Sequence, residues 1–185
     1  CDYYGGGIYC NTSSLTISNA TISGNTASSS GGGGYCNNEN NNNSPIISNV
    51  TISGNTASYG GGIRCQSSSP TISNATIIGN TASYGGGIYC NNSSPTTSNS
   101  IVSDNSSGEI YTYSGSPTVT YSDIQGGYTG NGNIDSNPFF VDAANGDYRL
   151  SDYSPCIGAG TSDGAPTTDI DGNPRPNPEG STPDM

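Results

Sequence analysis

The sequence predicts an all-β fold, in which one elongated chain winds into a parallel β-helix (a β-solenoid) of about five coils with roughly 25 residues each. A long internal repeat sets this period. Within each repeat, apolar residues alternate with polar ones in short segments rich in Ile, Val and Thr, which is typical of strands. Asn, Gly and Ser fill the intervals between these segments and favour turns.

The repeat consists of two blocks. The first, Tyr-Gly-Gly-Gly-Ile-Tyr-Cys with some variation, occurs at residues 4–10, 30–36, 59–65 and 84–90. The second, Thr-Ile-Ser-Asn-Ala-Thr-Ile-Ser-Gly-Asn-Thr-Ala-Ser, occurs at residues 16–28, near 47–58, at 71–83 and, in decayed form, at 96–108. A degenerate fifth copy runs from Glu109 to about Gly127. Residues 37–43 form an insertion, which we expect to be a loop on one corner of the solenoid.

Equivalent positions of successive coils should stack on each other and form ladders. Gly triplets and β-branched runs oppose helices, so we expect three short strands in each coil. Because strand side chains alternate, Ile8 and Cys10 should point inward and Tyr9 outward. One internal ladder is expected to comprise Ile22, Ile52, Ile77, Val102 and Ile124, and another Ile17, Ile47, Ile72, Thr97 and Val119.

Two columns of asparagine also recur with the period of the repeat. The first comprises Asn19, Asn49, Asn74 and Asn99, and the second Asn25, Asn55, Asn80 and Asn105. Asn tolerates left-handed backbone angles, and stacked amides can hydrogen-bond to each other. We therefore expect both columns to form internal amide ladders between strands.

The sequence divides into three parts, which we expect to be the coils (1–127), a capping segment (128–160) and a tail (161–185). The capping segment contains two apolar runs separated by Asn145-Gly146, which is a hairpin signal. We expect this hairpin to cover the last coil. The tail is rich in Pro, Asp and Gly, and we expect it to lack regular structure.

Composition excludes several functions and suggests a location. The net charge is −11, with no His and with three cations, Arg64, Arg149 and Arg175. Nucleic-acid binding and docking on anionic membranes both need clustered Lys or Arg, so neither is expected. No stretch is apolar enough for membrane insertion. Six Cys in such a chain suit an oxidising compartment, which predicts an extracellular or cell-surface protein.

The repeat blocks resemble the right-handed parallel β-helix repeats of secreted and cell-surface proteins in bacteria and archaea. The group includes proteins similar to polymorphic outer-membrane proteins. Residues 138–150, Ser154-Pro155-Cys156 and residues 169–176 resemble the usual C-terminal portion of these proteins. The resemblance implies a right-handed helix. It says little about activity, because this fold hosts lyases, hydrolases, adhesins and fibres.

No catalytic site is expected. Sites resembling those of pectate lyases need clustered Asp around Ca²⁺ and a basic residue, whereas polygalacturonase-like sites also use His. The chain has no His, and its acids before Glu109 are Asp2, Glu39 and Asp104. Glycoside hydrolysis needs two facing carboxylates, and no pair of acids occupies adjacent coils at equivalent positions.

Two columns of the first block are candidate sites. Cys10, Cys36, Cys65 and Cys90 share one inward column. Adjacent coils bring equivalent Cα atoms near the distance of a disulfide, so Cys10–Cys36 and Cys65–Cys90 bridges are one prediction. Stacked free thiols are the alternative. An outward column comprises Tyr9, Tyr35, Arg64, Tyr89 and Tyr111. It is interpreted as a self-stabilising surface ladder, with binding of sugars or a partner chain as the alternative.

Weaker signals concern modification and metal binding. Among several Asn-x-Ser/Thr triplets, Asn11, Asn42 and Asn91 are the preferred glycosylation candidates because we expect them on loops. Asp169, Asp171 and Asn173 resemble half of a Ca²⁺ loop, so weak Ca²⁺ binding is a hypothesis alongside a solvated turn. No other cofactor is expected.

Three functional hypotheses remain. The first is a structural subunit that self-associates head to tail into a filament, because the strand edges of the first coil would be uncapped. The second is a stalk or adhesin segment of a larger surface protein. The third, which is disfavoured, is a carbohydrate-binding or polysaccharide-degrading module.

Overall fold

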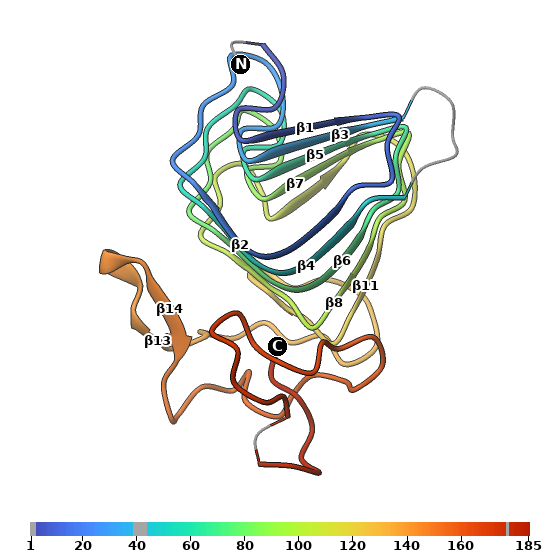
Figure 1. The fold of residues 1–185 in the computed structure, drawn as a ribbon. Helices are drawn as coiled ribbons and strands as arrows, with labels where there is room; N and C mark the ends of the chain where they lie inside the picture. The colour runs from blue at the N-terminus through green and yellow to red at the C-terminus, as the bar shows by residue number, and fades with distance from the viewer. Residues whose placement is uncertain (1–2, 39–43, 177) are drawn as a thin grey trace.

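Two parallel sheets face each other across one core (Figure 1). The computed structural model describes residues 3–38, 44–176 and 178–185, so Cys1 and Asn42 lie outside the described residues. The first sheet stacks β1 (Ile8–Asn11), β3 (Gly34–Asn37), β5 (Ile63–Gln66), β7 (Ile88–Asn91) and β10 (Ile110–Thr112). The second stacks β2 (Thr16–Ser23), β4 (Ile46–Ser53), β6 (Thr71–Ile78), β8 (Thr96–Ser98) and β11 (Thr118–Thr120).

Successive coils pair in the register that the repeat predicts. Tyr59 aligns with Tyr84, and Cys65 with Cys90. Both predicted internal ladders are confirmed, since their members align from coil to coil; Ile52, Ile72, Ile77 and Val102 are at most 1% exposed. The parallel β-helix is therefore confirmed, and its core consists of stacked identical or similar side chains.

The second and third predicted strands of each coil run as one strand in the first three coils. Asn19, Asn49 and Asn74 lie in the middle of β2, β4 and β6 with φ of 52°, 58° and 50°, so the chain bends there without leaving the sheet. In the fourth and fifth coils the strand divides, and β9 (Ile101–Ser103) and β12 (Asp123–Ile124) continue it. The last coil is short, so the solenoid makes about four turns, slightly fewer than the five predicted.

The column of Asn25, Asn55, Asn80 and Asn105 forms the predicted internal amide ladder. The side-chain oxygen of Asn80 accepts hydrogen bonds from the backbone N–H of Asn55 (2.9 Å) and from its Nδ2 (3.0 Å). The Nδ2 of Asn80 in turn donates to the Ile52 carbonyl and to the Asn105 side chain, both at 2.9 Å. Asn55 and Asn80 are fully buried, so every polar atom of these amides depends on a neighbouring coil.

The glycine triplets are explained by the close approach of neighbouring coils. A Cβ atom at Gly61 would lie 2.6 Å from the Thr81 carbonyl oxygen, and one at Gly62 would lie 2.6 Å from the Gly87 oxygen. Side chains cannot be accommodated at such distances from backbone. The triplet therefore records where two coils touch through backbone alone.

The C-terminal part departs from the prediction in where it packs. The predicted hairpin exists, as antiparallel strands β13 (Phe140–Asp142) and β14 (Asp147–Leu150) joined by a 3₁₀ turn, η1 (Ala143–Asn145). It does not cover the last coil. Phe140 and Leu150 pack instead near Ile101 on the outer face of the second sheet, together with Cys156 and Met185.

The last coil is closed by the segment just before the hairpin. Ile134 forms a parallel bridge with Asp123, and the Asn133 side chain donates to the Val119 carbonyl (3.0 Å). Tyr128 packs against the end of the main core. The capping role predicted for residues 128–160 thus falls to the first part of that range.

The tail lacks long strands, but it is anchored along the side of the solenoid. Its anchors belong to the first asparagine column. The Asn99 amide donates to the Thr161 carbonyl (2.7 Å) and accepts from the Thr161 N–H (2.8 Å). Asn49 donates to the Thr168 carbonyl (3.1 Å) and accepts from Arg175 (3.2 Å). The predicted contact between stacked amides is present at the start of the column, where the Asn49 amide donates to the Asn19 side-chain oxygen (2.7 Å). At Asn99 the amide bonds to the tail instead, so the predicted internal ladder is confirmed only in part.

Replacing Asn80 by Ala is expected to lower the free energy of unfolding by about 2–4 kcal/mol, because it leaves buried donors and acceptors of two coils without partners. Urea denaturation followed by circular dichroism measures this change. Thr71→Ala on the exposed face of β6 is the control and should change stability by less than about 0.5 kcal/mol. Equal effects of the two substitutions would contradict the ladder's importance.

Candidate functional site: a tyrosine–arginine face

The outward column predicted from the sequence lies on the first sheet. Its members align from coil to coil, in the order Tyr9, Tyr35, Arg64, Tyr89 and Tyr111. Tyr9 and Tyr111 are 45% and 36% exposed, but Tyr35 and Tyr89 are only 6% and 5% exposed. Something beyond the column must therefore cover its middle.

A second column, which the sequence analysis did not assign, provides that cover. The residues that begin the first repeat block pair through isolated parallel bridges, in the order Tyr4, Ser30, Tyr59 and Tyr84. Their rings contact the first column: the Tyr59 ring lies 5.3 Å from that of Tyr89, and the Tyr84 ring 5.6 Å from that of Tyr111. We call the two columns together the tyrosine–arginine face. The Tyr that precedes the glycine run in three of the four repeats was the signal for it.

Rings within each column stack on each other. Tyr59 and Tyr84 have centroids 5.5 Å apart with planes 9° from parallel, and Tyr89 and Tyr111 have centroids 5.5 Å apart with planes 6° from parallel. Such pairs contribute about 0.5–1.5 kcal/mol beyond the area they bury. Each ring of a stacked pair covers part of its neighbour's face, which is the surface that a sugar ring would need. This geometry favours a self-stabilising ladder over a platform for sugar rings.

Arg64 fills the position where the second column lacks a tyrosine. Ser30 stands in that column between Tyr4 and Tyr59, and the guanidinium of Arg64 donates to its hydroxyl. Arg64 also donates to the Gln66 side chain at 2.9 Å. The guanidinium carbon lies 5.2–5.4 Å from three ring centres, those of Tyr35, Tyr59 and Tyr89. Cation–π attraction thus replaces a missing ring contact, and the face remains continuous.

The four stacked cysteines are buried free thiols in the structure. Cys10, Cys36, Cys65 and Cys90 align in register inside the core and are at most 3% exposed. Burial raises the pKa of Cys36 to about 12, and contact with Cys90 together with burial raises the pKa of Cys65. Because the thiolate is the reactive form, these groups are unreactive while the coils stay closed. The disulfide pairing stays a prediction.

The two glycosylation candidates that the structure describes do not lie on loops as expected. Asn11 ends β1 and Asn91 ends β7. Asn11 is exposed and accepts a hydrogen bond from Asn37 (3.2 Å), whereas the Asn91 amide donates to Gln66 (3.0 Å) and accepts from Ser114 (3.1 Å). Asn11 is therefore the more accessible of these two acceptors. Glycosylation itself stays a prediction.

The residues proposed for Ca²⁺ lie together in one turn of the tail. The Asp169 carboxylate accepts the backbone N–H groups of Asp171 (2.9 Å) and Asn173 (2.8 Å), and the Asn173 amide donates to it at 2.8 Å. The described residues contain no group of three His, Cys, Asp or Glu suited to a metal. Calcium binding stays a prediction, in which the ion would compete with these hydrogen bonds.

A cleft of about 1190 Å³ separates the C-terminal part from the outer face of β2, β4 and β6. The Asn74 amide lines it, and neither of its polar atoms has a hydrogen-bond partner.

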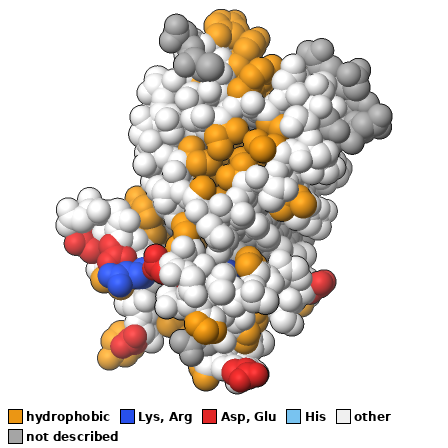
Figure 2. All heavy atoms as spheres, in the orientation of Figure 1, with side chains coloured by type: hydrophobic (Ala, Val, Ile, Leu, Met, Phe, Trp, Pro, Cys, Tyr) orange, Lys and Arg blue, Asp and Glu red, His pale blue; other side chains and the backbone are white. Residues whose placement is uncertain are grey.

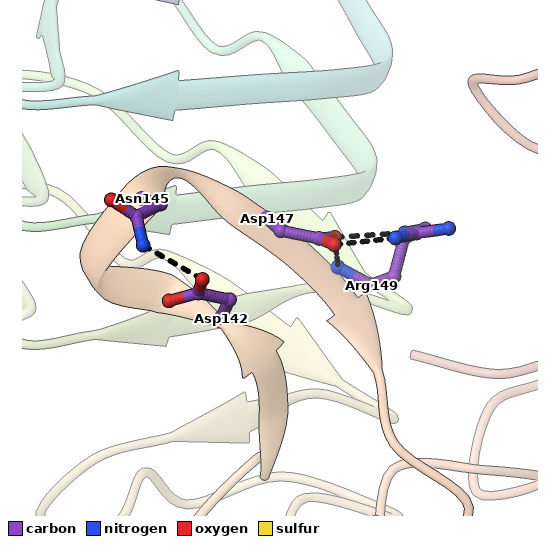
Figure 3. A network of polar contacts seen from close by, with 4 residues as sticks. All are labelled: Asp142, Asn145, Asp147 and Arg149. Atoms are coloured by element: carbon purple, nitrogen blue, oxygen red, sulfur yellow. Dashed lines mark hydrogen bonds and ion pairs between the residues drawn. The ribbon is translucent and has the colours of Figure 1, made fainter.

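The hairpin lies on the opposite side of the cleft, where Asn145 donates to Asp142 and Arg149 pairs with Asp147 (Figure 3). Hydrogen bonds from Arg149 lower the pKa of Asp147 to about 2. The exposed pair adds little to stability.

A buried carboxylate joins the last coil to the C-terminal part. Asp123 is 1% exposed and accepts the Ser136 N–H (3.0 Å), while the Cys156 thiol lies 3.2 Å from its other oxygen. Burial is the main cause that raises the pKa of Asp123 above its ordinary value of 3.8. Burial likewise raises the pKa of Glu109, which bonds to Asn105. These acids have structural partners.

The stacked register, the internal ladders and the aromatic face together define a parallel β-helix that presents one continuous side-chain surface. The chain belongs to the family described as the right-handed β-helix region, whose model matches residues 2–137. A search of curated proteins and a search of solved structures each returned no match. The β-helix family predicted from the repeat is thereby confirmed. The described residues include no helix of the length and apolarity that a membrane span requires.

We predict that Asp123 contributes stability that is lost as the pH rises above 3.8, the ordinary pKa of this acid. The raised pKa means that the folded state favours the protonated acid, so its contribution is complete at low pH and is lost through the folded-state pKa. Asp123→Asn should flatten this slope in urea titrations between about pH 4 and 7. Asp163→Asn, at an exposed site, is the control; an unchanged slope in Asp123→Asn would disprove the assignment.

Proposed function

We propose that the chain is an extracellular structural protein, a β-solenoid subunit that stacks head to tail into a filament or surface fibre. The observation that carries the proposal is the uniform register in which successive coils stack, because a coil of a second copy can continue it. Within the described residues, β1 pairs only with β3 and β2 only with β4. An unpaired strand edge is a template for another chain.

The same end exposes part of the core. Figure 2 shows hydrophobic side chains gathered between the strands at this end of the solenoid. Four inward side chains of the first coil are only half-buried, whereas their equivalents in the third coil are fully buried; the four are Ile8, Leu15, Ile17 and Ala20. A further coil placed on this edge would complete the ladders. We propose that a second copy of the chain takes the place of this further coil. Its closed end, around Tyr128, would lie on the unpaired edge.

The proposed role is non-catalytic. Glu109 and Asp123, two acids of the coils, are held by hydrogen bonds within the structure. Asp123 aligns with Ile101, so it does not face Asp104 across adjacent coils. Glycoside hydrolysis requires two carboxylates on either side of a bond, and this arrangement supports no such pair.

The second candidate is a stalk or adhesin segment of a larger surface protein. The tyrosine–arginine face favours it, since it carries exposed rings such as Tyr84 (47%) along one side of the rod. Tyr and Arg are enriched where proteins bind partners. In this case the rod is a spacer, and the face is its contact surface.

Electron microscopy of the native protein tests the first candidate. Fibres with an axial repeat near one rod, roughly 25 Å for five strand spacings, are expected. Leu15→Glu places a charge on the inner side of the open edge and should abolish the fibres. Thr16→Glu adds the same charge on the outer side of the same edge and should leave them intact. Dispersed monomers or closed dimers of the unaltered chain would contradict head-to-tail stacking and favour the second candidate.

A further inference from the structure

The second column of the tyrosine–arginine face, which begins at Tyr4, holds two phenol rings in a fixed, accessible stack. Tyr59 and Tyr84 belong to successive coils and align through a parallel bridge. Their centroids are 5.5 Å apart, their planes are 9° from parallel, and they are 36% and 47% exposed. The coils on either side hold both backbones, so the rings cannot drift apart while the protein is folded.

Phenols in such a stack are arranged for oxidative coupling. A one-electron oxidant removes an electron and the hydroxyl proton from each ring, and the unpaired electron of the resulting radical resides partly on the carbons beside the C–O carbon. Two radicals in contact join through these carbons. Each carbon then loses its hydrogen as the ring regains aromaticity and the oxygen regains a proton. The net change is the loss of two protons and two electrons.

We propose that Tyr59 and Tyr84 are a modification site, at which a dityrosine bond joins the third coil covalently to the fourth. The oxidant is of the haem-peroxidase class, with hydrogen peroxide as the acceptor of the two electrons and two protons, forming two molecules of water. The bond would close a loop of 25 residues at the surface of the rod. Cross-links of this kind stabilise mainly by restricting the unfolded chain.

The composition and burial of the chain direct oxidation to this face. The sequence has no Trp and one Met, and Met185 is only 9% exposed. The described thiols are buried, with Cys65 and Cys90 at 0% exposure. Tyrosines are therefore the accessible oxidisable side chains of the described coils.

Other ring pairs on the face are less suited than Tyr59–Tyr84. Tyr4 and Tyr9 are both exposed and stacked, but their centroids are farther apart, at 6.2 Å, and their planes are 18° from parallel. Tyr89 and Tyr111 stack equally well, but Tyr89 is 5% exposed, so an outside oxidant reaches it poorly. Tyr59 and Tyr89 meet edge to face, at 64°, which separates most of their reactive carbons. In the first column, Arg64 lies between Tyr35 and Tyr89 and keeps their rings apart.

A single tryptic cleavage makes this site directly measurable. Trypsin cuts after Arg64 and so separates Tyr59 from Tyr84; its next site is Arg149. The full chain is treated at low concentration with horseradish peroxidase and hydrogen peroxide. Chains that remain monomeric are then isolated under denaturing, reducing conditions and digested. We expect fragments 1–64 and 65–149 to remain joined, with dityrosine fluorescence and a mass lower than their sum by two hydrogen atoms.

Conservative variants assign the bond. Tyr59→Phe keeps the ring stack but lacks one phenol, so the joined fragment should be lost. Tyr84→Phe should lose most of it, because only the edge-to-face contact with Tyr89 remains. Tyr153→Phe removes a tyrosine that is 90% exposed and lies outside the face, and it should leave the joined fragment unchanged.

Two results would overturn the proposal: oxidised wild-type fragments that separate fully, or joining that persists in Tyr59→Phe or at full yield in Tyr84→Phe. The readout comes from single chains. Its failure would therefore leave head-to-tail stacking untouched, and the absence of fibres would leave the cross-link standing.

Discussion

The coils of this structure depend on one constraint: equivalent atoms of neighbouring coils must lie one strand spacing apart, about 4.8 Å. The asparagine column that runs from Asn25 to Asn105 satisfies this constraint through hydrogen bonds between side-chain amides. The Asn55 amide donates to Ile22 of the coil before and to Asn80 of the coil after, so each coil fixes the height of the next. The glycine triplets follow from the same constraint, because at Gly62 and its equivalents backbone touches backbone.

The constraint also explains how the repeat tolerates variation. A residue that differs from its equivalents changes the contacts of the coils on both sides, so its neighbours must compensate. Ser30 leaves a gap in the second column of the tyrosine–arginine face. The planar guanidinium of Arg64, in the next coil, fills this gap and donates a hydrogen bond to the serine. The compensation joins two columns, which makes the aromatic face one cooperative surface rather than a set of separate pairs.

The sequence repeat predicted the features that recur in every coil. Stacking of Ile22 on Ile52 and of Cys65 on Cys90 follows from period and alternation alone, as does the amide ladder at Asn55 and Asn80. The docking of the tail on Asn49 and Asn99 could not be predicted, because it joins a periodic surface to a segment without a period. The lateral packing of the hairpin was missed for the same reason. The second column of the tyrosine–arginine face was missed because its residues lie outside the strands.

The central claim, that amide ladders hold the coils in register, is tested most directly by native-state hydrogen exchange read by NMR. Asn55 follows the end of β4 and Asn80 the end of β6, so neither N–H has a partner in a strand. Each donates instead to an asparagine side chain of the next coil at 2.9 Å. If the ladders hold the coils in register, these two N–H groups should exchange as slowly as those of Ile52 and Ile77 in the core. Exchange at the rate of exposed turns such as that at Asp171 would contradict it.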